Sequence, residues 1–212
     1  MKTTRKPTSL DYAILGLVNQ QPQTGYGIRK AFETTALGNY SSSPGVIYPA
    51  LKRLQELGLV VNATINDTKK SKFHCTEEGE SILKEWLLKP IEVTDIAKNL
   101  NDLLLRFAFM ENLLNRALQI EFLSSFQDVL KKYIKSLKEY HKSQFNTMPL
   151  NARLAFEHGI DSYTTTLKWC VKTISDLKKQ KNENKYFKRN HRHLHRRDIR
   201  YRGHHSRTRS SR

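Results

Sequence analysis

The sequence contains little cysteine and no long apolar run. Only Cys75 and Cys170 are cysteines among its 212 residues, and they do not form a Cys-x-x-Cys pair. This excludes a disulfide scaffold and a zinc finger, and it suits a reducing cytoplasm. No run of 18 apolar residues exists, so no transmembrane helix is expected. Asp11 interrupts the short apolar stretch near the start, so no signal peptide is expected either.

The chain also lacks the usual signatures of catalysis. Gly25-Tyr26-Gly27 is neither preceded by a predicted strand nor followed by a phosphate-loop pattern, and no Ser/His/Asp set or carboxylate pair stands out. His191, His193 and His195 have metal-ligand spacing, but the basic segment around them disfavours a cation. Cys75, close to two basic side chains, leaves a redox role open. We therefore expect no enzyme, no metal and no cofactor.

What the sequence has in excess is positive charge. Its 37 Lys+Arg against 20 Asp+Glu give a formal net charge of +17. Residues 181–212 hold twelve Lys/Arg and two acids, a net +10, so residues 1–180 carry +7. This tail has almost no apolar periodicity and is expected to be disordered, because it cannot bury enough surface to offset its ordering entropy. It either adds sequence-independent attraction to phosphate or is a frameshifted terminus.

Apolar periodicity predicts two helices before residue 35. The first is capped by Ser9 and runs to about Asn19, and the second is capped by Thr24 after a run of turn-forming residues. The expected buried faces are Leu10, Ile14, Leu17 and Val18 in the first helix, and Ile28, Ala31 and Phe32 in the second.

A third helix is expected after Ser43-Pro44, and it has two chemically different faces. Pro49 lacks an N–H group and draws the expected start toward Gly45 or Val46, while Gly58 is placed to end the helix in a left-handed conformation. One face is apolar and suited to packing. The opposite face offers groups either to a nucleic-acid groove or to solvent, and periodicity alone does not decide between these. The apolar face holds Ile47, Ala50, Leu51, Leu54 and Leu57, and the other holds Gly45, Tyr48, Pro49, Lys52, Gln55 and Glu56.

Residues 59–75 are typical of a β-hairpin whose tip is positively charged. Leu59–Ile65 is rich in β-branched residues, Asn66-Asp67 is a turn signal and Phe73–Cys75 is a second short strand. Three helices followed by such a hairpin predict a winged helix-turn-helix, in which the third helix enters the major groove and the wing contacts phosphates. The expected phosphate-binding residues of the wing are Lys69, Lys70 and Lys72.

The rest of the chain up to the tail is expected to be helical. Thr76 caps a fourth helix that ends before Pro90, a short core helix spans about 99–111, and a longer helix runs over about 112–144. The last helix repeats apolar residues in steps of four and three, which is the pattern of a helix–helix seam.

The apolar seams of the two long helices have two interpretations. They can pack against each other within one chain, or they can join two chains. A dimer is favoured because one winged helix reads one half-site and a pair matches a palindromic operator. Cys170 lies on the seam and is interpreted as a packing thiol. The residues expected to dimerise are Leu123, Phe126, Leu130, Tyr133, Leu137, Phe156, Ile160, Tyr163, Leu167, Ile174 and Leu177.

Several motifs resemble those of the PadR family of transcriptional regulators. The most specific is Tyr48-Pro49-Ala50-Leu51 within the run 43–54, and Gly25-Tyr26-Gly27-Ile28 continues the match. The resemblance covers roughly residues 9–180 and is to the longer, two-domain branch of the family, which implies dimerisation through the C-terminal helices. One departure is in the wing, where Asp67–Lys72 stands in place of a Gly-Arg-x-Arg-Lys run. Lysine in place of arginine keeps the phosphate attraction and weakens the case for bidentate or minor-groove readout.

These features predict a cytoplasmic, homodimeric regulator that binds double-stranded DNA at a palindromic operator and acts as a repressor. The third helix would read bases, and the second helix and the wing would meet phosphates. Two alternatives stay open: an activator of the same family, and a winged-helix adaptor that binds proteins without specific DNA binding. The expected DNA-contacting residues are Arg29, Lys30, Ser43, Tyr48, Pro49, Lys52, Gln55, Lys69, Lys70 and Lys72.

The expected fold is mainly α. It has three to four helices and a β-hairpin wing at residues 1–90, a helical, coiled-coil-like dimerisation domain at 91–180, and the tail at 181–212. No membrane contact is expected. The resemblance also implies that a small aromatic effector can bind between the domains or at the dimer interface. The residues that would line such a cavity, and that are ordinary core in the other interpretation, are Trp86, Leu100, Leu104, Phe107 and Trp169.

Overall fold

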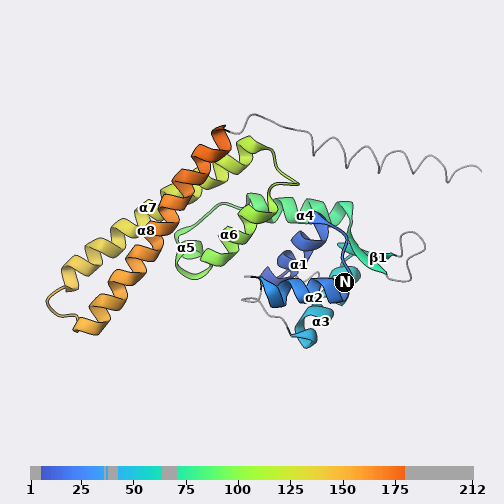
Figure 1. Ribbon diagram of the computed structural model, residues 1–212, viewed down its shortest axis with the longest axis horizontal. Coiled ribbons are helices and arrows are strands. Elements are labelled where there is room, and N and C mark those ends of the chain that lie inside the picture. Colours follow the sequence, from blue (N-terminus) through green and yellow to red (C-terminus); the bar gives the residue numbers. More distant parts are fainter. Residues whose placement is uncertain (1–5, 36, 38–42, 64–70, 180–212) are drawn as a thin grey trace, which may run out of the picture.

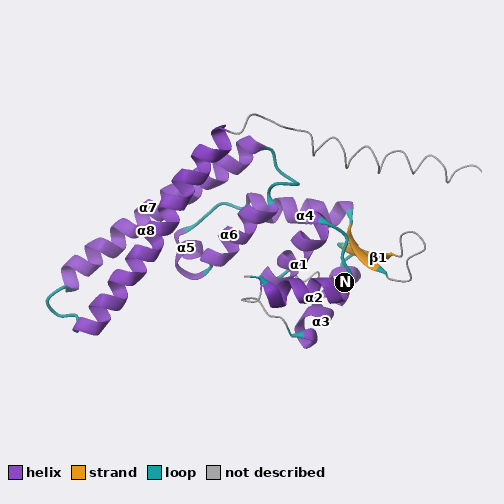
Figure 2. Cartoon of the chain, viewed as in Figure 1, coloured by secondary structure: helices purple, strands orange, loops and turns teal. Residues whose placement is uncertain are grey.

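A computed structural model describes residues 6–35, 37, 43–63 and 71–179 of the chain. Within these residues, the first four helices pack together with a small antiparallel β-hairpin at their edge, and the chain then continues into a long helical hairpin (Figures 1 and 2). The expected mainly α fold, a winged helix followed by a helical region, is confirmed. The elements are α1 (Ser9–Gln20), α2 (Gly25–Thr34), α3 (Pro44–Glu56), β1 (Val60–Ala63), β2 (Lys72–Cys75), α4 (Glu77–Leu88), α5 (Val93–Lys98), α6 (Leu100–Phe109), α7 (Arg116–Gln144) and α8 (Leu150–Lys179).

Helix α1 begins with a capping box. The Thr8 hydroxyl accepts from the Asp11 N–H (3.3 Å), and the Asp11 carboxylate accepts from the Thr8 N–H (2.8 Å), so two otherwise unpaired donors are satisfied. The expectation that Ser9 caps this helix is wrong. Ser9 is the first helical residue, and its hydroxyl donates to Asp102 on α6 (2.8 Å). Thr24 caps α2 as expected.

Helix α3 begins at Pro44, with Ser43 as its N-cap residue. The later start expected from Pro49 is therefore wrong, and Pro49 lies inside the helix. The first turn is already closed before Pro49, because the N–H groups of Val46 and Ile47 donate to the Ser43 carbonyl (3.0 and 3.1 Å). The missing N–H of Pro49 then costs the helix one hydrogen bond, and the apolar face of α3, which packs into the core, stabilises it in spite of that loss.

Gly58 ends α3 in the left-handed conformation expected for it, with a φ of 73°. Its N–H donates to the Gln55 carbonyl (2.9 Å), and the Leu59 N–H donates to the Leu54 carbonyl (2.9 Å). This is the Schellman pattern, which satisfies the last carbonyls of a helix and turns the chain sharply. The turn sends the chain directly into β1.

Strands β1 and β2 form the hairpin expected for the wing. They pair antiparallel, with Val60 opposite Cys75 at the base. The turn between α1 and α2 joins this sheet through an isolated bridge, since the backbones of Gln23 and Phe73 exchange two hydrogen bonds (3.2 and 2.7 Å). The wing is therefore fixed to the helix-turn-helix through Phe73 of β2.

The later helices follow their caps. Thr76 caps α4 as expected, since its hydroxyl accepts from the Gly79 N–H (3.0 Å). Helix α7 begins at Arg116 rather than near Asn112, because the Asn115 side chain accepts an N–H of the first turn (3.0 Å). The short helix α5 was not expected, and its six residues are too few to show a helical period.

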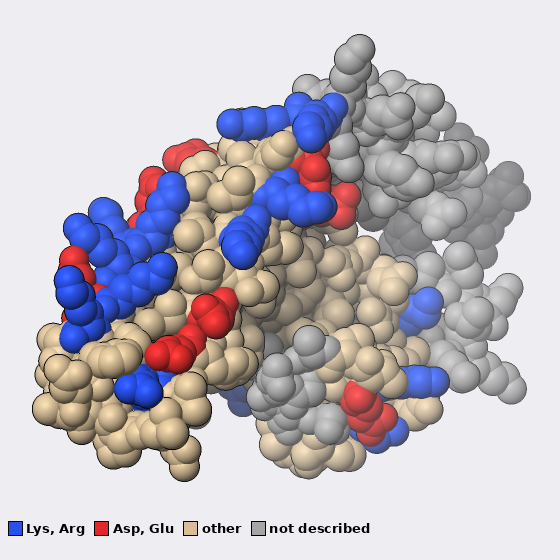
Figure 3. Space-filling model, turned by 60° about the vertical axis from the view of Figure 1, so that its left-hand side comes forward, with Lys and Arg blue, Asp and Glu red and all other residues tan. Residues whose placement is uncertain are grey.

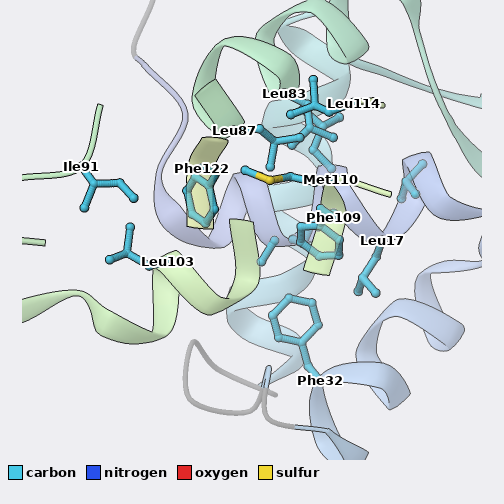
Figure 4. Packing of buried hydrophobic residues seen from close by; sticks show 14 of the residues in the cluster. Leu17, Phe32, Leu83, Leu87, Ile91, Leu103, Phe109, Met110, Leu114 and Phe122 are labelled. Atoms are coloured by element: carbon cyan, nitrogen blue, oxygen red, sulfur yellow. The ribbon is translucent and has the colours of Figure 1, made fainter. Parts of the chain in front are cut away.

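One apolar core joins the winged helix to the helices that follow it. Figure 4 shows Leu83 and Leu87 of α4 close to Phe109 and Met110 at the end of α6, with Phe122 of α7 nearby. Helices α4, α5 and α6 thereby connect the two parts of the molecule. Beyond them, α7 and α8 pack on each other as an antiparallel hairpin that extends away from the winged helix (Figure 1). In the part of the chain that the structure describes, no helix combines the length and apolar character needed to cross a membrane.

Candidate nucleic-acid interface

The two faces of α3 are separated as the sequence predicts. Ile47, Ala50, Leu51 and Leu54 are buried, whereas Leu57 at the end is only half-buried. The opposite face is open to solvent, with 46% of Tyr48 and 79% of the Lys52 side chain exposed. The residues that share this exposed face are Gly45, Tyr48, Pro49, Lys52, Gln55 and Glu56.

The ring of Tyr48 is seated against the start of α2. A Cβ atom added to Gly25 would lie 2.8 Å from Cε1 of Tyr48 and 3.7 Å from the ring of Phe73. Only glycine leaves room for the Tyr48 ring here, because a Cβ atom would lie closer to the ring than real Cβ atoms approach other atoms. The contact fixes one edge of the Tyr48 ring while the rest stays exposed, so the aromatic group is presented in a defined position rather than as a loose side chain.

An ion pair with a buried carboxylate holds α3 on α1. Asp11 is completely buried, and its carboxylate accepts from Nε (3.2 Å) and Nη2 (2.5 Å) of Arg53. It also accepts from the N–H and the hydroxyl of Thr8 (2.8 and 2.9 Å), so the buried charge has four donors. Bidentate pairing of this kind fixes orientation as well as distance. The pair therefore sets the rotation of α3 that turns Tyr48 and Lys52 outward.

Local sequence patterns do not identify the pair of Asp11 and Arg53. Asp11 was noted only as a charge inside an apolar stretch, and Arg53 lies 42 residues away. The available signal was the spacing Thr8-x-x-Asp11, which is a capping pattern. That pattern explains the capping box but does not identify Arg53 as the second partner.

The second helix contributes a different set of groups. Arg29 donates to Glu33 one turn later, and its guanidinium carbon lies 5.3 Å from the centroid of the Tyr26 ring. Arg29 is thus already partnered, whereas Lys30 is exposed. Tyr26 has 60% of its surface exposed and was missed as a candidate contact. Its position directly after Gly25, against which Tyr48 packs, was the signal that could have identified it.

The wing is described in its two strands. Lys72 is exposed at the first position of β2, whereas Lys69 and Lys70 lie outside the described residues. Burial, and after it the positive charge of Lys72, lowers the pKa of His74. The Nε2 atom of His74 is buried, with no hydrogen-bond partner among the described residues. His74 is therefore a neutral side chain at neutral pH and adds no charge to the wing.

Three of the five residues expected to line an effector cavity belong to two separate ring pairs. Trp86 stacks on Tyr12, with ring centroids 4.7 Å apart and planes inclined by 4°, and Trp169 meets the ring of Phe107 edge-on at 5.5 Å. Leu100 is half-buried and Leu104 is 37% exposed. These contacts are those of packed core and surface residues.

The residues expected to dimerise lie mostly between α7 and α8 of the same chain. Leu123, Phe126, Leu130 and Ile160 are buried within the single chain, and Tyr133 of α7 meets Tyr163 of α8 edge-on with ring centroids 5.2 Å apart. The others, which are half-buried, are Leu137, Phe156, Leu167, Ile174 and Leu177. The intrachain interpretation of the seam thus accounts for these contacts, and any pairing of chains has to use what this packing leaves exposed.

Nothing in the described ranges resembles a metal centre. Among residues 6–35, 37, 43–63 and 71–179, no three His, Cys, Asp or Glu side chains are grouped so that they could hold an ion. His191, His193 and His195 lie outside these ranges. The groups that lie together are the start of α2 at Gly25, Tyr48 of α3 and Phe73 of the wing.

Three packed helices, a hairpin fixed at its base and an outward-facing third helix define a winged helix-turn-helix domain. Residues 14–85 match the sequence profile of the transcriptional regulator PadR-like family. These residues therefore form a PadR-like domain, and the resemblance drawn from the Tyr48 motif is confirmed.

Two curated relatives are similar to the same part of the chain. The transcriptional regulator YqjI of Escherichia coli (strain K12) is 40% identical over 78 residues, which is 36% of this chain and 36% of that protein. The negative transcriptional regulator PadR of Bacillus subtilis (strain 168) is 32% identical over 93 residues, 42% of this chain and 51% of that protein. The matched segment thus spans about a third to a half of these relatives. Both are named as transcriptional regulators and not as enzymes, which agrees with the expectation drawn from the sequence.

Two solved structures of Bacillus subtilis PadR are similar to this chain at a lower sequence identity. Bacillus subtilis PadR in complex with operator DNA is 23% identical, covering 80% of this chain and 99% of that chain, with a TM-score of 0.37. Bacillus subtilis PadR in complex with p-coumaric acid is 20% identical, covering 81% of this chain and all of that chain, with a TM-score of 0.38. The likeness to the PadR-like family lies in residues 14–85.

Proposed function

We propose that this protein is a sequence-specific DNA-binding transcriptional regulator that represses transcription as a dimer on a palindromic operator. The observation that carries the proposal is the exposed face of α3. There Tyr48 is seated on Gly25, and the helix is held by the ion pair of Asp11 and Arg53. A rigid helix with an exposed polar and aromatic face is what insertion into a major groove requires. Repression is supported by the name of the Bacillus subtilis relative.

The proposed contacts divide by chemistry. Tyr48, Lys52 and Gln55, with Pro49 beside them, would face base edges, whereas the charged groups of α2 and the wing would meet phosphates. Ser43 lies exposed at the N-terminus of α3, where a helix end favours an anion. The proposed phosphate contacts are Arg29, Lys30, Ser43, Lys69, Lys70 and Lys72.

We propose residues 1–90 as the DNA-binding unit and residues 91–180 as the dimerisation unit. Support for pairing comes from α8, a helix of thirty residues of which only Ile160 and Cys170 are buried in the single chain. A helix of this length covered on one face by α7 leaves much of its surface for another partner. The aromatic effector also stays a proposal. The Bacillus subtilis PadR complex with p-coumaric acid supplies the class of compound to screen, and the Trp86 and Trp169 ring pairs would have to open to admit it.

The test begins with selection of duplexes from a random library by the full-length protein, followed by fluorescence anisotropy on the selected and a scrambled duplex. Tyr48→Ala should lose about 1–3 kcal/mol of the preference between them. Lys72→Ala should weaken both about equally and lower the slope of log affinity against log salt by about one. Lys138→Ala, which makes the same charge change at an exposed site of α7, is the matched control.

Two outcomes would contradict the proposal. If the library yields no enriched sequence, the winged-helix adaptor becomes the better account. The one acid on the exposed face of α3, Glu56, lies 3.9 Å from Lys52, so this face has little of the negative potential that an adaptor for basic partners would need. If Tyr48→Ala weakens both duplexes equally, the base-reading surface lies elsewhere on the domain.

A further inference from the structure

Arg106 occupies the junction between the winged helix and the helical region. It is the buried arginine of α6, with 4% of its surface exposed, and it faces the C-terminal end of α4 and the first turns of α7. Figure 4 shows the apolar side chains of this junction, among them Leu87 of α4, Leu103 of α6 and Phe122 of α7. Buried arginines are rare because removing their charge from water is unfavourable. The presence of Arg106 in this place therefore needs an explanation.

Its guanidinium links two helices that belong to different parts of the molecule. The Nη2 atom donates to the carbonyl of Leu87 (2.8 Å) and to that of Lys89. Both carbonyls are at the end of α4, where Pro90 follows and helical partners are missing. On its other side the guanidinium carbon lies 4.9 Å from the ring centroid of Phe122 on α7. The guanidinium of Arg106 thus contacts both the C-terminal end of α4, the last helix of the winged-helix domain, and α7, the first helix of the α7–α8 hairpin.

The charge of Arg106 is retained at neutral pH. Burial lowers the pKa of Arg106 to about 10, against the opposing effect of Asp95 and Asp102, which still leaves it protonated. Its Nε atom is buried and has no hydrogen-bond partner among the described residues. An unsatisfied donor in such a place is unfavourable, so the contacts that hold the guanidinium are those to the two carbonyls of α4 and to the Phe122 ring.

We propose that Arg106 is a positioning residue that fixes the angle between the winged helix and the α7–α8 hairpin, and through that angle the spacing of the two half-sites that a dimer reads. This inference rests on the proposed dimeric function. In the proposed dimer the two hairpins pair with each other and each carries one winged helix. A change of angle at the junction therefore changes the distance between the two α3 helices. The half-site spacing that the dimer prefers depends on this distance, so the preferred spacing is the quantity that tests the role of Arg106.

The experiment uses the full-length protein and duplexes built from a half-site selected from a random library by the wild-type protein. The spacer between two copies of that half-site is varied one base pair at a time, and a duplex with a single half-site is included. The wild-type protein should prefer one spacing by about tenfold or more, because half-sites must match the separation of the recognition helices. Arg106→Met should reduce this preference to about twofold while single-half-site affinity stays within about twofold.

Three further variants separate positioning from stability. Arg106→Lys keeps the charge but has neither two parallel donors nor a planar group over Phe122, so it should lose part of the spacing preference. Phe122→Leu keeps an apolar side chain and all backbone contacts of Arg106 while removing the ring, and it should also broaden the preference. Arg116→Met is the matched control, because it also removes an arginine that donates to a backbone carbonyl, and that carbonyl belongs to Leu177 of α8. It should keep the wild-type spacing preference.

The possible failures are distinguishable. If the wild-type protein binds all spacings alike or selects no half-site, the proposed function fails. If the wild-type protein has a preferred spacing and Arg106→Lys and Phe122→Leu, both folded by circular dichroism, keep it in full, the inference about Arg106 is overturned. Should Arg106→Met not fold, these two variants still decide the matter.

Discussion

Asp11 and Arg53 meet where α1 crosses α3, and the two ends of the pair differ in their access to water. The Asp11 side chain is completely buried, whereas 30% of the Arg53 side chain is exposed. Removing the arginine leaves a carboxylate inside the protein with only the two Thr8 donors. Removing the carboxylate leaves an arginine that can turn to solvent. The same ion pair should therefore respond differently to the loss of each partner.

We expect Arg53→Met to lower the free energy of unfolding by about 2–3 kcal/mol, and Asp11→Asn to lower it by less, because only the first leaves a buried charge uncompensated. Urea denaturation followed by circular dichroism measures both. Lys52→Met on the exposed face of the same helix is the control and should stay within about 0.5 kcal/mol of the wild type. An Arg53→Met variant as stable as this control would show that the buried carboxylate does not need the arginine.

The two thiols are also governed by burial. Burial raises the pKa of Cys75 and of Cys170 to about 11. The thiolate is the reactive form, so both groups are almost entirely unreactive thiols at pH 8. This disfavours the redox role left open for Cys75 by its basic neighbours.

Alkylation by iodoacetamide should therefore be slow in the folded protein. Its rate should keep rising by about tenfold per pH unit between pH 8 and pH 10, because the thiolate fraction rises that way below the pKa. The urea-unfolded protein serves as the reference and should level off above the ordinary thiol pKa of about 8.5. A folded protein whose rate already levels off near pH 9 would show a thiolate that burial does not suppress.

At the scale of the elements, α1 and the Phe109 ring at the end of α6 approach so closely that only glycine fits at position 16. A Cβ atom on Gly16 would lie 2.3 Å from the Phe109 ring, whereas one on Gly159 in α8 would meet nothing within 4 Å. Gly16→Ala should thus lower the free energy of unfolding by about 1–3 kcal/mol through overpacking. Gly159→Ala should raise it by up to about 1 kcal/mol, because alanine favours a helix.

The two glycine variants form a matched pair, since each adds one methyl group inside a helix. Chemical denaturation at a fixed protein concentration compares them directly. If Gly16→Ala proves as stabilising as Gly159→Ala, α6 does not sit against α1 as closely as the structure places it, and the connection between the two parts of the molecule is looser.

The elements that the sequence predicted well are those decided by local signals. The periodicity of α3 identified both faces, and Gly58 and Thr76 were correctly placed as the end of one helix and the cap of another. The cap of α1 was misplaced by one residue because Thr8 and Ser9 are both good caps, and the choice depends on Asp11 bonding back. The role of Arg53 could not be predicted, because its partner Asp11 lies 42 residues away in the sequence and only the fold brings the two together.

The seams of α7 and α8 show a second limit of this kind. Heptad spacing identifies which residues face a neighbouring helix, but it contains no information about whether that helix belongs to the same chain. The structure places much of the seam inside one chain, with Tyr140 near Phe156 and Tyr133 near Tyr163. Pairing of chains then becomes a question about the surface of the whole molecule.

On that surface, lysine and arginine gather over the α7–α8 hairpin rather than over the winged helix alone (Figure 3). Five exposed lysines lie within the α7 segment 131–142, against one acid, and they are Lys131, Lys132, Lys135, Lys138 and Lys142. Four of them line a shallow groove of about 390 Å³ together with Ile134 and Leu167. Two copies of this lysine row facing each other would repel, so a two-fold interface should use other faces of the hairpin.

If the chain pairs through the hairpin, its stability should depend on its own concentration. Each tenfold rise in protein concentration should add about 1.4 kcal/mol to the apparent free energy of unfolding, because only the folded state dimerises. Urea midpoints measured over a hundredfold concentration range, with sedimentation equilibrium on the same samples, test this. Lys135→Glu should leave the dissociation constant of the dimer within about twofold, since the lysine row lies outside the expected interface. A midpoint that does not move, together with a monomer at every concentration, would leave the exposed surface of α8 without a partner copy. The recognition helix would then have to act on single half-sites.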